Sequence, residues 1–406
     1  MTPAFKQTEI GAIPEDWAVT TLGTLLAFTN GLNADKAAYG KGMPFINVME
    51  PITRSHIYGP EIPGRIQIPS EAALAYLVKP NDIVFNRTSE TDSELGLAAV
   101  YLGDERVVFG GFVIRGRPIS DALDPKYSGY ALRAKTIRSQ IISMGQGAIR
   151  ANIGQQNLQR VLVAVPPKCE QRAIAQALSD IDALITALDC LIAKKRDIKQ
   201  AMMQQLLTGK TRLPGFSGKW EVKTFGQAVV PRRERIDPRR NGVHAFCIEL
   251  EHIESASGQI LGNTSTGNHS SLKSVFYNGD ILFGKLRAYL RKYWRATRHG
   301  VCSTEIWVLV PRAETITSEF LFQIIQTDEF IDAASNSYGT HMPRSDWNIV
   351  KNYEFKLPTV PEQVAIAAVL SDMDAELTAL EARRDKTRAI KQGMMQELLT
   401  GKTRLI

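Results

Sequence analysis

The sequence predicts a mixed α/β (α+β) protein in which two related domains are joined by two long helices. Three observations predict this fold. One block of sequence occurs twice, its apolar residues recur at alternating steps of four and three, and the segment before each block holds short β-rich runs. At 406 residues the chain is also longer than one ordinary core requires, which favours two or more domains.

The repeated block is nearly the same in both copies. The run that begins at Glu170 recurs from Glu362, 192 positions further on, and continues without a gap to Leu213 and Leu405. About two-thirds of the paired positions are identical. A region that keeps its sequence in both copies is expected to meet the same partner twice.

Each copy of the block is predicted to form one long helix with a coiled-coil seam. The seam residues are Ile174, Leu178, Ile181, Ile185, Leu188 and Ile192 in the first copy, and Ile366, Leu370, Met373, Leu377 and Leu380 in the second. Prolines precede both blocks, and Gly209 and Gly401 follow them as expected helix stops. A helix over residues 170–207 would be about 57 Å long.

A helix with one narrow apolar seam is not expected to be stable alone. We therefore expect the two helices to pack as an antiparallel pair, with one domain at each end and a pseudo-two-fold axis between the halves. The alternative is that each helix packs separately on its own domain. The expected divisions are residues 1–165 and 210–357 for the domains, and 166–209 and 358–406 for the helices.

The two domains repeat each other only faintly. Trp17 parallels Trp220, and both domains contain β-rich runs, at 82–85, 106–115, 279–283 and 305–310. Each domain ends with a helix-like stretch, at 127–144 and 318–335. A segment that keeps only its apolar framework is expected to meet different ligands in its two copies.

Basic, amide and aromatic side chains cluster in loops of these domains. The net charge is +7 and the pI about 9.1, which suits a polyanionic partner without establishing one. Arginine pairs with guanine, and asparagine or glutamine with adenine, in the DNA major groove. The candidate DNA contacts are Asn86, Arg87, Gln146, Arg150 and Asn152 in the first domain, and Lys285, Arg287, Tyr289, Arg291, His341 and Arg344 in the second. For any single residue the alternative is a solvated surface turn.

Signs of catalysis, metal binding and membrane insertion are absent from the sequence. It holds no methyltransferase tetrad, no HExxH and no Ser–His–Asp order, and the Gly-Lys-Thr at Gly209 and Gly401 lacks the upstream glycine of a P-loop. The spacing of His244, Cys247 and His252 matches no common zinc pattern, so no metal is expected. The four cysteines are expected to be free thiols. With no membrane span and no secretory signal, a cytoplasmic protein is expected.

Three motifs and the two-copy layout together resemble a known family. The opening TEIGAIPEDWAVTTLG, the helix entry PxxxEQxAIAxxLSDxDA and the helix exit MMQxLLTGKTRL resemble the specificity (S) subunits of type I restriction–modification systems. The resemblance covers essentially the whole chain. It implies a non-catalytic protein with two target-recognition domains, each of which reads one half of a bipartite site in double-stranded DNA.

The resemblance also implies partners. The two helices would act as a spacer and dock two methyltransferase (M) subunits, and restriction (R) subunits would join them. No cofactor is expected in this chain, because S-adenosylmethionine would be bound by the M subunits and ATP and Mg by the R subunits. The main alternative function is a helical scaffold with peptide- or RNA-binding domains. A third alternative, a single-chain nuclease, is disfavoured because the sequence shows no acidic metal site.

Overall fold

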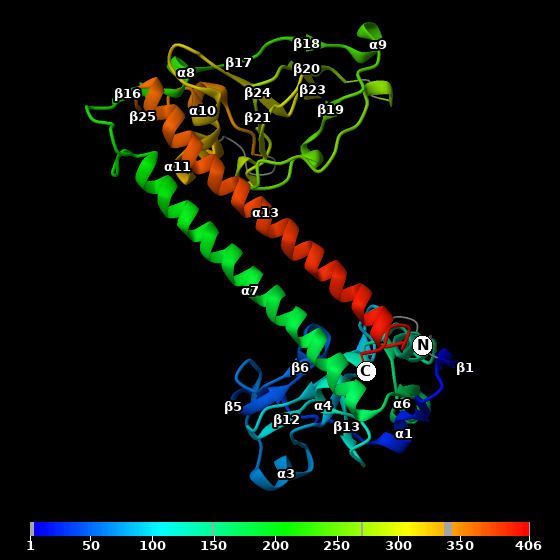
Figure 1. Ribbon diagram of the computed structural model, residues 1–406. Coiled ribbons are helices and arrows are strands. Elements are labelled where there is room, and N and C mark those ends of the chain that lie inside the picture. Colours follow the sequence, from blue (N-terminus) through cyan, green and yellow to red (C-terminus); the bar gives the residue numbers. More distant parts are fainter. Residues whose placement is uncertain (1–3, 148–149, 269–270, 337–342, 406) are drawn as a thin grey trace. The chain divides into compact units, whose positions relative to one another are not determined.

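The computed structural model describes residues 4–147, 150–268, 271–336 and 343–405, and the chain forms two compact units. Unit 1 comprises Met1–Leu188 and Arg383–Ile406, and unit 2 comprises Asp189–Ala382. Two long helices, α7 (Lys168–Leu206) and α13 (Val360–Leu398), each contribute one end to each unit (Figure 1). The two expected long helices are therefore confirmed.

Local sequence explains where these helices begin and end. Proline-containing segments precede both, and Glu170 and Glu362 lie in the first turns, where a negative charge favours the helix dipole. Gly209 and Gly401 follow the last turns with φ of +71°. Because glycine adopts this left-handed conformation without a steric penalty, both residues end their helices as predicted.

The helices run antiparallel within each unit. In unit 1, Ile174 and Leu178 near the start of α7 pack with Leu398 and Leu399 at the end of α13. In unit 2 the opposite ends meet, because a single core contains Leu206 of α7 together with Ile366, Ala367 and Leu370 of α13. The alternative in which each helix packs alone on its own domain is therefore wrong.

Ion pairs follow the same antiparallel register. Asp182 bonds Lys391 at 2.6 Å in unit 1, and Lys199 bonds Asp374 at 2.5 Å in unit 2. The predicted seam is buried most completely at Ile174, Leu178, Leu188, Ile192, Ile366 and Leu370. Its other predicted members, Ile181, Ile185, Met373, Leu377 and Leu380, are only half-buried.

Unit 1 contains two main sheets. One has the order β4-β13-β9-β11-β6 and the other the order β7-β5-β12-β8. The strands of the first sheet are β4 (Leu26–Asn30), β13 (Val113–Pro118), β9 (Ile83–Asn86), β11 (Ala98–Tyr101) and β6 (His56–Ile57). Those of the second are β7 (Arg65–Ile66), β5 (Tyr39–Ile46), β12 (Val107–Phe109) and β8 (Leu77–Val78).

Unit 2 repeats most of this topology. Its first sheet has the order β17-β24-β21-β22, from β17 (Val229–Pro231), β24 (Ile306–Pro311), β21 (Ile281–Gly284) and β22 (Tyr293–Arg295). Its second has the order β18-β20-β23-β19, from β18 (Arg235–Ile236), β20 (Lys273–Phe276), β23 (Gly300–Ser303) and β19 (Cys247–Ile248). In both units a parallel pair, β5 with β12 and β19 with β23, lies in the second sheet.

A separate strand pair leads into each long helix. In unit 1, β3 (Ala18–Thr21) pairs with β15 (Leu162–Val165) just before α7. In unit 2, β16 (Glu221–Thr224) pairs with β25 (Glu354–Leu357) just before α13. These pairs join the start of each domain to the segment that enters its helix.

Each helix-like stretch predicted near the end of a domain is divided in two. The first forms α4 (Pro125–Ala131) and α5 (Lys135–Ser143), and the second forms α10 (Ser318–Ile324) and α11 (Asp328–Ser335). Thr327 explains the second break, because its side-chain oxygen caps α11 by accepting from the Phe330 backbone N–H. Apolar periodicity continues across such a cap, so it gave no sign of the break. Among the described residues, no helix combines the length and apolarity needed to cross a membrane.

Candidate nucleic-acid interface

In unit 1 the structure brings together the two loops that were predicted to contact DNA. The Arg87 N–H, just after β9, donates to the Phe112 carbonyl at 2.9 Å, and the Arg87 carbonyl accepts from the Ile153 N–H at 3.0 Å. Two short strands then pair, β10 (Thr88–Ser89) with β14 (Ala151–Asn152). Residues 86–89, 110–113 and 150–153 therefore form one three-segment junction at the end of β9.

Unit 2 contains the same junction, formed by residues 284–287, 303–306 and 343–345. The Lys285 N–H donates to the Glu305 carbonyl at 3.0 Å, and the Lys285 carbonyl accepts from the Ser345 N–H at 2.8 Å. Leu286 forms a β-bridge with Arg344. The hydrogen-bond pattern is therefore the same as in unit 1, although the side chains differ.

The predicted residues of unit 1 differ in how far they reach the surface. Asn86 is completely buried, and its Nδ2 donates to the Glu94 carbonyl at 3.0 Å while Oδ1 has no hydrogen-bond partner. It therefore presents no polar atom to a partner in this conformation. Arg87 is half-buried, and its Nη1 donates to the Gly111 carbonyl at 3.3 Å. Gln146, Arg150 and Asn152 are exposed.

Arg150 is held by a carboxylate that sequence reasoning did not select. Its Nε and Nη2 both donate to Glu90 Oε1, at 3.2 and 2.7 Å, and both side chains are largely exposed. Asn152 Nδ2 donates to the Arg150 carbonyl at 3.1 Å. Gln146 lies beside them through reciprocal backbone hydrogen bonds with Asn152.

The predicted residues of unit 2 fall into two groups. In the first group, Arg287, Tyr289 and Arg344 are exposed and Lys285 is half-buried. Arg344 Nε donates to Glu305 Oε2 at 3.0 Å. Arg291 instead binds its own unit, because it pairs with Asp328 and donates to the Gln326 carbonyl. His341 lies outside the described residues.

Sequence reasoning missed two residues at the junctions, Phe112 and Glu305. Phe112 is 56% exposed and follows Gly110-Gly111 in the turn between β12 and β13. A glycine pair interrupts the β-rich run at 106–115, and such a pair indicates a turn. In the structure the run divides at this turn into β12 and β13.

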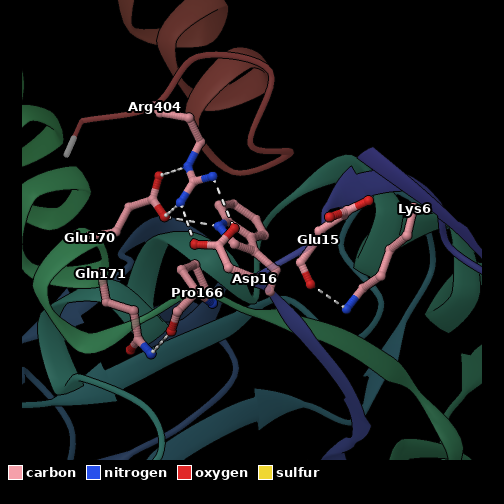
Figure 2. Close-up of polar contacts among 8 residues, drawn as sticks. Lys6, Glu15, Asp16, Pro166, Glu170, Gln171 and Arg404 are labelled. Carbon is pink, nitrogen blue, oxygen red and sulfur yellow. Dashed lines mark hydrogen bonds and ion pairs between the residues drawn. The ribbon is translucent and has the colours of Figure 1, made fainter. Parts of the chain in front are cut away.

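A second group of polar contacts explains why the ends of the two long helices repeat the same residues. Glu170, buried in the first turn of α7, accepts from Arg404 Nε at 2.5 Å and from Trp17 Nε1 at 2.8 Å. Arg404 also bonds Asp16 at 2.7 Å, and this guanidinium holds the pKa of Asp16 below its ordinary value. Figure 2 shows Arg404 between Glu170 and Asp16.

Unit 2 contains the matching contacts. We call each group of a buried glutamate with its arginine and tryptophan partners a clamp. Glu362, buried in the first turn of α13, accepts from Arg212 Nε at 2.5 Å and from Trp220 Nε1 at 3.1 Å. The arginine of each Thr-Gly-Lys-Thr-Arg motif therefore ties the segment after one helix to the first turn of the other. This contact accounts for the arginine of a motif whose Gly-Lys-Thr lacks the upstream glycine of a P-loop.

The glutamine that follows each clamp glutamate has an equally specific role. Gln171 Nε2 donates to the Pro166 carbonyl at 2.8 Å (Figure 2). Its Oε1 accepts from the Asp124 N–H at 2.7 Å. Gln363 makes the same pair of contacts, to the Pro358 carbonyl at 3.0 Å and from the Thr317 N–H at 2.9 Å. The Glu-Gln pair therefore fixes each helix start to its own domain.

His252 and Cys247, whose spacing matches no common zinc pattern, make other contacts. His252 Nδ1 accepts from the Glu249 N–H at 3.0 Å, and burial raises the pKa of the Cys247 thiol to about 12. A thiol with so high a pKa remains protonated at neutral pH. In the part of the chain that the structure describes, no group of three or more His, Cys, Asp or Glu side chains is arranged to hold a metal ion.

Comparison with known proteins gives one consistent family. A family model described as the type I restriction modification DNA specificity domain matches residues 14–194 and 261–389. A chain assigned as the specificity subunit of the type I restriction enzyme MjaX, from Methanocaldococcus jannaschii, is 25% identical over 99% of this chain and 97% of its own length. The EcoDI specificity subunit of Escherichia coli is 22% identical over 96% of this chain and 88% of its own.

Solved structures agree at the level of the fold. The type I restriction–modification S subunit from M. genitalium superposes with a TM-score of 0.58 at 16% identity, over 98% of this chain and 99% of that one. A chain from a study of complex assembly and conformational transition in the type I restriction–modification system gives a TM-score of 0.59 at 14% identity, over 96% and 99%.

The repeated domain and the paired helices define a DNA-recognition component rather than an enzyme. The chain belongs to the family of type I restriction–modification specificity subunits, and both of its matched regions are DNA specificity domains.

Proposed function

We propose that this chain recognises a bipartite site in double-stranded DNA, with one half-site contacted by each junction, and that it recruits methyltransferase and restriction subunits to that site. Membership of the family supports the role in DNA specificity, and the two junctions support the division of the site into two halves. As a DNA-binding protein it would act in the cytoplasm, where the DNA is.

The observation that carries the proposal is the repetition of one backbone junction with different side chains. The hydrogen bonds at Arg87 and at Lys285 are equivalent, yet Phe112 and Asn152 in unit 1 stand where Glu305 and Arg344 stand in unit 2. The backbone hydrogen bonds are the same in both junctions, whereas the side chains differ. Two different base sequences require such a difference, because base edges are distinguished by their donors and acceptors.

The helices support recruitment of two copies of one partner. Ile198 and Ile390 occupy the same position in the two copies of the block, and they are 41% and 46% exposed. An exposed apolar residue that is kept in both copies suits a contact made twice with the same M subunit. S-adenosylmethionine would then be bound by the M subunits, and ATP and Mg by the R subunits.

Genome methylation mapping tests DNA recognition directly. A host without other restriction–modification systems would express this chain with its M partner, and one gapped, two-part motif should be methylated. A gel shift against random duplex DNA and against RNA of matched length, with and without M subunits, provides the second readout. Preference for RNA, or binding to peptides alone, would favour the scaffold function instead.

A pair of substitutions tests recruitment. Ile198→Asp together with Ile390→Asp should weaken copurification of M subunits, because both place a charge in the proposed contact. Leu191→Asp is the matched control. Leu191 is also an apolar residue of α7 and is 39% exposed, but the equivalent residue in the second copy of the block is Arg383, so this position is not repeated. Equal loss of M subunits in the control would contradict a contact made through the repeated positions.

A further inference from the structure

The two junctions allow their side chains to be compared position by position. Phe112 and Glu305 are equivalent because their carbonyls accept from Arg87 and Lys285, the residues that follow β9 and β21. Asn152 and Arg344 are equivalent because they pair with Thr88 and Leu286, one residue further along. Each junction therefore carries a corresponding pair, Phe112 with Asn152 and Glu305 with Arg344.

In unit 2 the pair has the chemistry to recognise guanine. Glu305 accepts from Arg344 through Nε alone, at 3.0 Å, while the Arg344 side chain remains 55% exposed. The carboxylate orients the guanidinium, and the Nη groups are left to donate to a partner. Two arginine N–H groups directed at O6 and N7 form the commonest specific contact to guanine.

In unit 1 the same positions have a different chemistry. Asn152 is exposed, and the side-chain hydrogen bond that it makes to a described residue uses a single N–H, which leaves Oδ1 and the other N–H for a ligand. An asparagine amide pairs with N6 and N7 of adenine, and an apolar side chain contacts the thymine methyl group. Phe112, 56% exposed, supplies the apolar side chain.

The neighbouring arginine does not change this assignment. Arg150 directs Nε and one N–H of Nη2 at Glu90 Oε1, which leaves three of its five N–H groups as donors. Arg344 differs because its carboxylate takes only Nε. The register of the junction aligns Asn152, and not Arg150, with Arg344, so Asn152 is the residue assigned here.

We infer that Asn152 with Phe112 selects an A·T pair in one half-site, and that Arg344 oriented by Glu305 selects a G·C pair in the other. This inference rests on the proposed function, since it names the base pairs at that same interface. Glu305 acts as a positioning residue and Arg344 as the base contact.

The test uses the complex of this chain with its M subunits. Methylation mapping first defines the native motif, and fluorescence anisotropy competition then compares duplexes in which each base pair of that motif is replaced in turn. Asn152→Ala should abolish discrimination at one A·T pair, and Arg344→Ala at one G·C pair of the other half-site. The expected loss at the affected pair is about 5- to 150-fold, with the remaining pairs unchanged.

Two further variants separate contact from positioning. Glu305→Gln should lower discrimination at the same G·C pair as Arg344→Ala while leaving binding to the other half-site unchanged. The double variant Phe112→Glu, Asn152→Arg transfers the unit 2 pair to unit 1, and it should convert the A·T preference to G·C at that single position.

Matched controls lie at the opposite ends of the same strands. Ile119 follows β13 and Arg312 follows β24, and both residues are exposed. The control variants are Ile119→Ala and Arg312→Ala. Neither should change the motif. In each variant the half-site read by the other unit serves as an internal measure of folding and assembly.

The outcomes distinguish this inference from the proposed function. A native complex that binds every duplex equally would overturn the proposed function itself. A native complex with a two-part motif that Asn152→Ala and Arg344→Ala leave unchanged, or relax at the opposite base-pair type, would overturn only the assignment of the base pairs.

Discussion

At the scale of single residues, two arginines of unit 2 differ in their contacts although their backbones are alike. Arg287 and Arg291 flank the short 3-10 helix η4 (Ala288–Leu290), and both are left-handed, with φ of +54° and +52°. Arg287 is exposed, whereas the Arg291 guanidinium pairs with Asp328. Composition could not separate them, because both belong to the same basic and aromatic run.

Arg287→Ala is therefore expected to weaken DNA binding, and Arg291→Ala is the matched control. A loss confined to the half-site of unit 2 would indicate a base contact of about 1–3 kcal/mol, and an equal loss on all sequences a phosphate contact. Arg291→Ala should instead lower thermal stability. Anisotropy titrations of both variants in complex with M subunits measure this, and undiminished binding by Arg287→Ala would contradict its predicted role.

The clamp glutamates are the second residue-scale feature. Replacing Glu170 or Glu362 with glutamine leaves an arginine without its buried ionic partner, so each change should cost about 1–3 kcal/mol in the free energy of unfolding. Glu376→Gln is the control, because its ion pair with Lys195 is partly exposed and should contribute only about 0–1 kcal/mol. Urea denaturation measures all three, and equal losses would argue against the clamps.

At the scale of elements, the long helices were predictable and the junctions were not. Helix periodicity, flanking proline and the final glycine are local signals, and the structure confirmed each of them in α7 and α13. The junction depends on β10 and β14, two-residue strands that are paired across more than sixty positions of sequence. Such short strands carry no periodicity of their own.

If the helices set the gap between half-sites, lengthening both should change it. One extra heptad in each helix keeps the seam in phase and adds about 10.5 Å at 1.5 Å per residue. At 3.4 Å per base pair, the preferred gap should grow by about three base pairs. Methylation mapping of the lengthened protein would show this shift, and an unchanged gap would show that the helices are not the spacer.

At the scale of the whole molecule, the two units should read DNA independently. Replacing residues 214–357 with the corresponding segment of another family member should change one half-site and preserve the other. The preserved half-site is the control for assembly, and simultaneous change of both would contradict independent recognition. Methylation mapping of the exchanged protein gives the result.

Binding by the whole complex should also depend steeply on salt. Each phosphate contacted lowers log K by about 0.9 per tenfold rise in salt concentration, because condensed counterions are released on binding. The net charge of +7 is compatible with such contacts. Titrations over a range of salt concentrations would return the number of phosphates contacted, and a flat response would contradict a DNA ligand.

The sequence by itself determined the repeat, the fold class, the long helices and the family, because these depend on periodicity and on residues that recur in linear order. Only the tertiary structure decided which side chains meet. Asn86 is buried, and Arg150 pairs with Glu90. Glu305 lies beside Arg344. The arginines of the two Gly-Lys-Thr-Arg motifs pair with Glu170 and Glu362. These contacts join residues far apart along the chain, and base selection depends on such contacts because donors and acceptors must be fixed in space before they can distinguish one base pair from another.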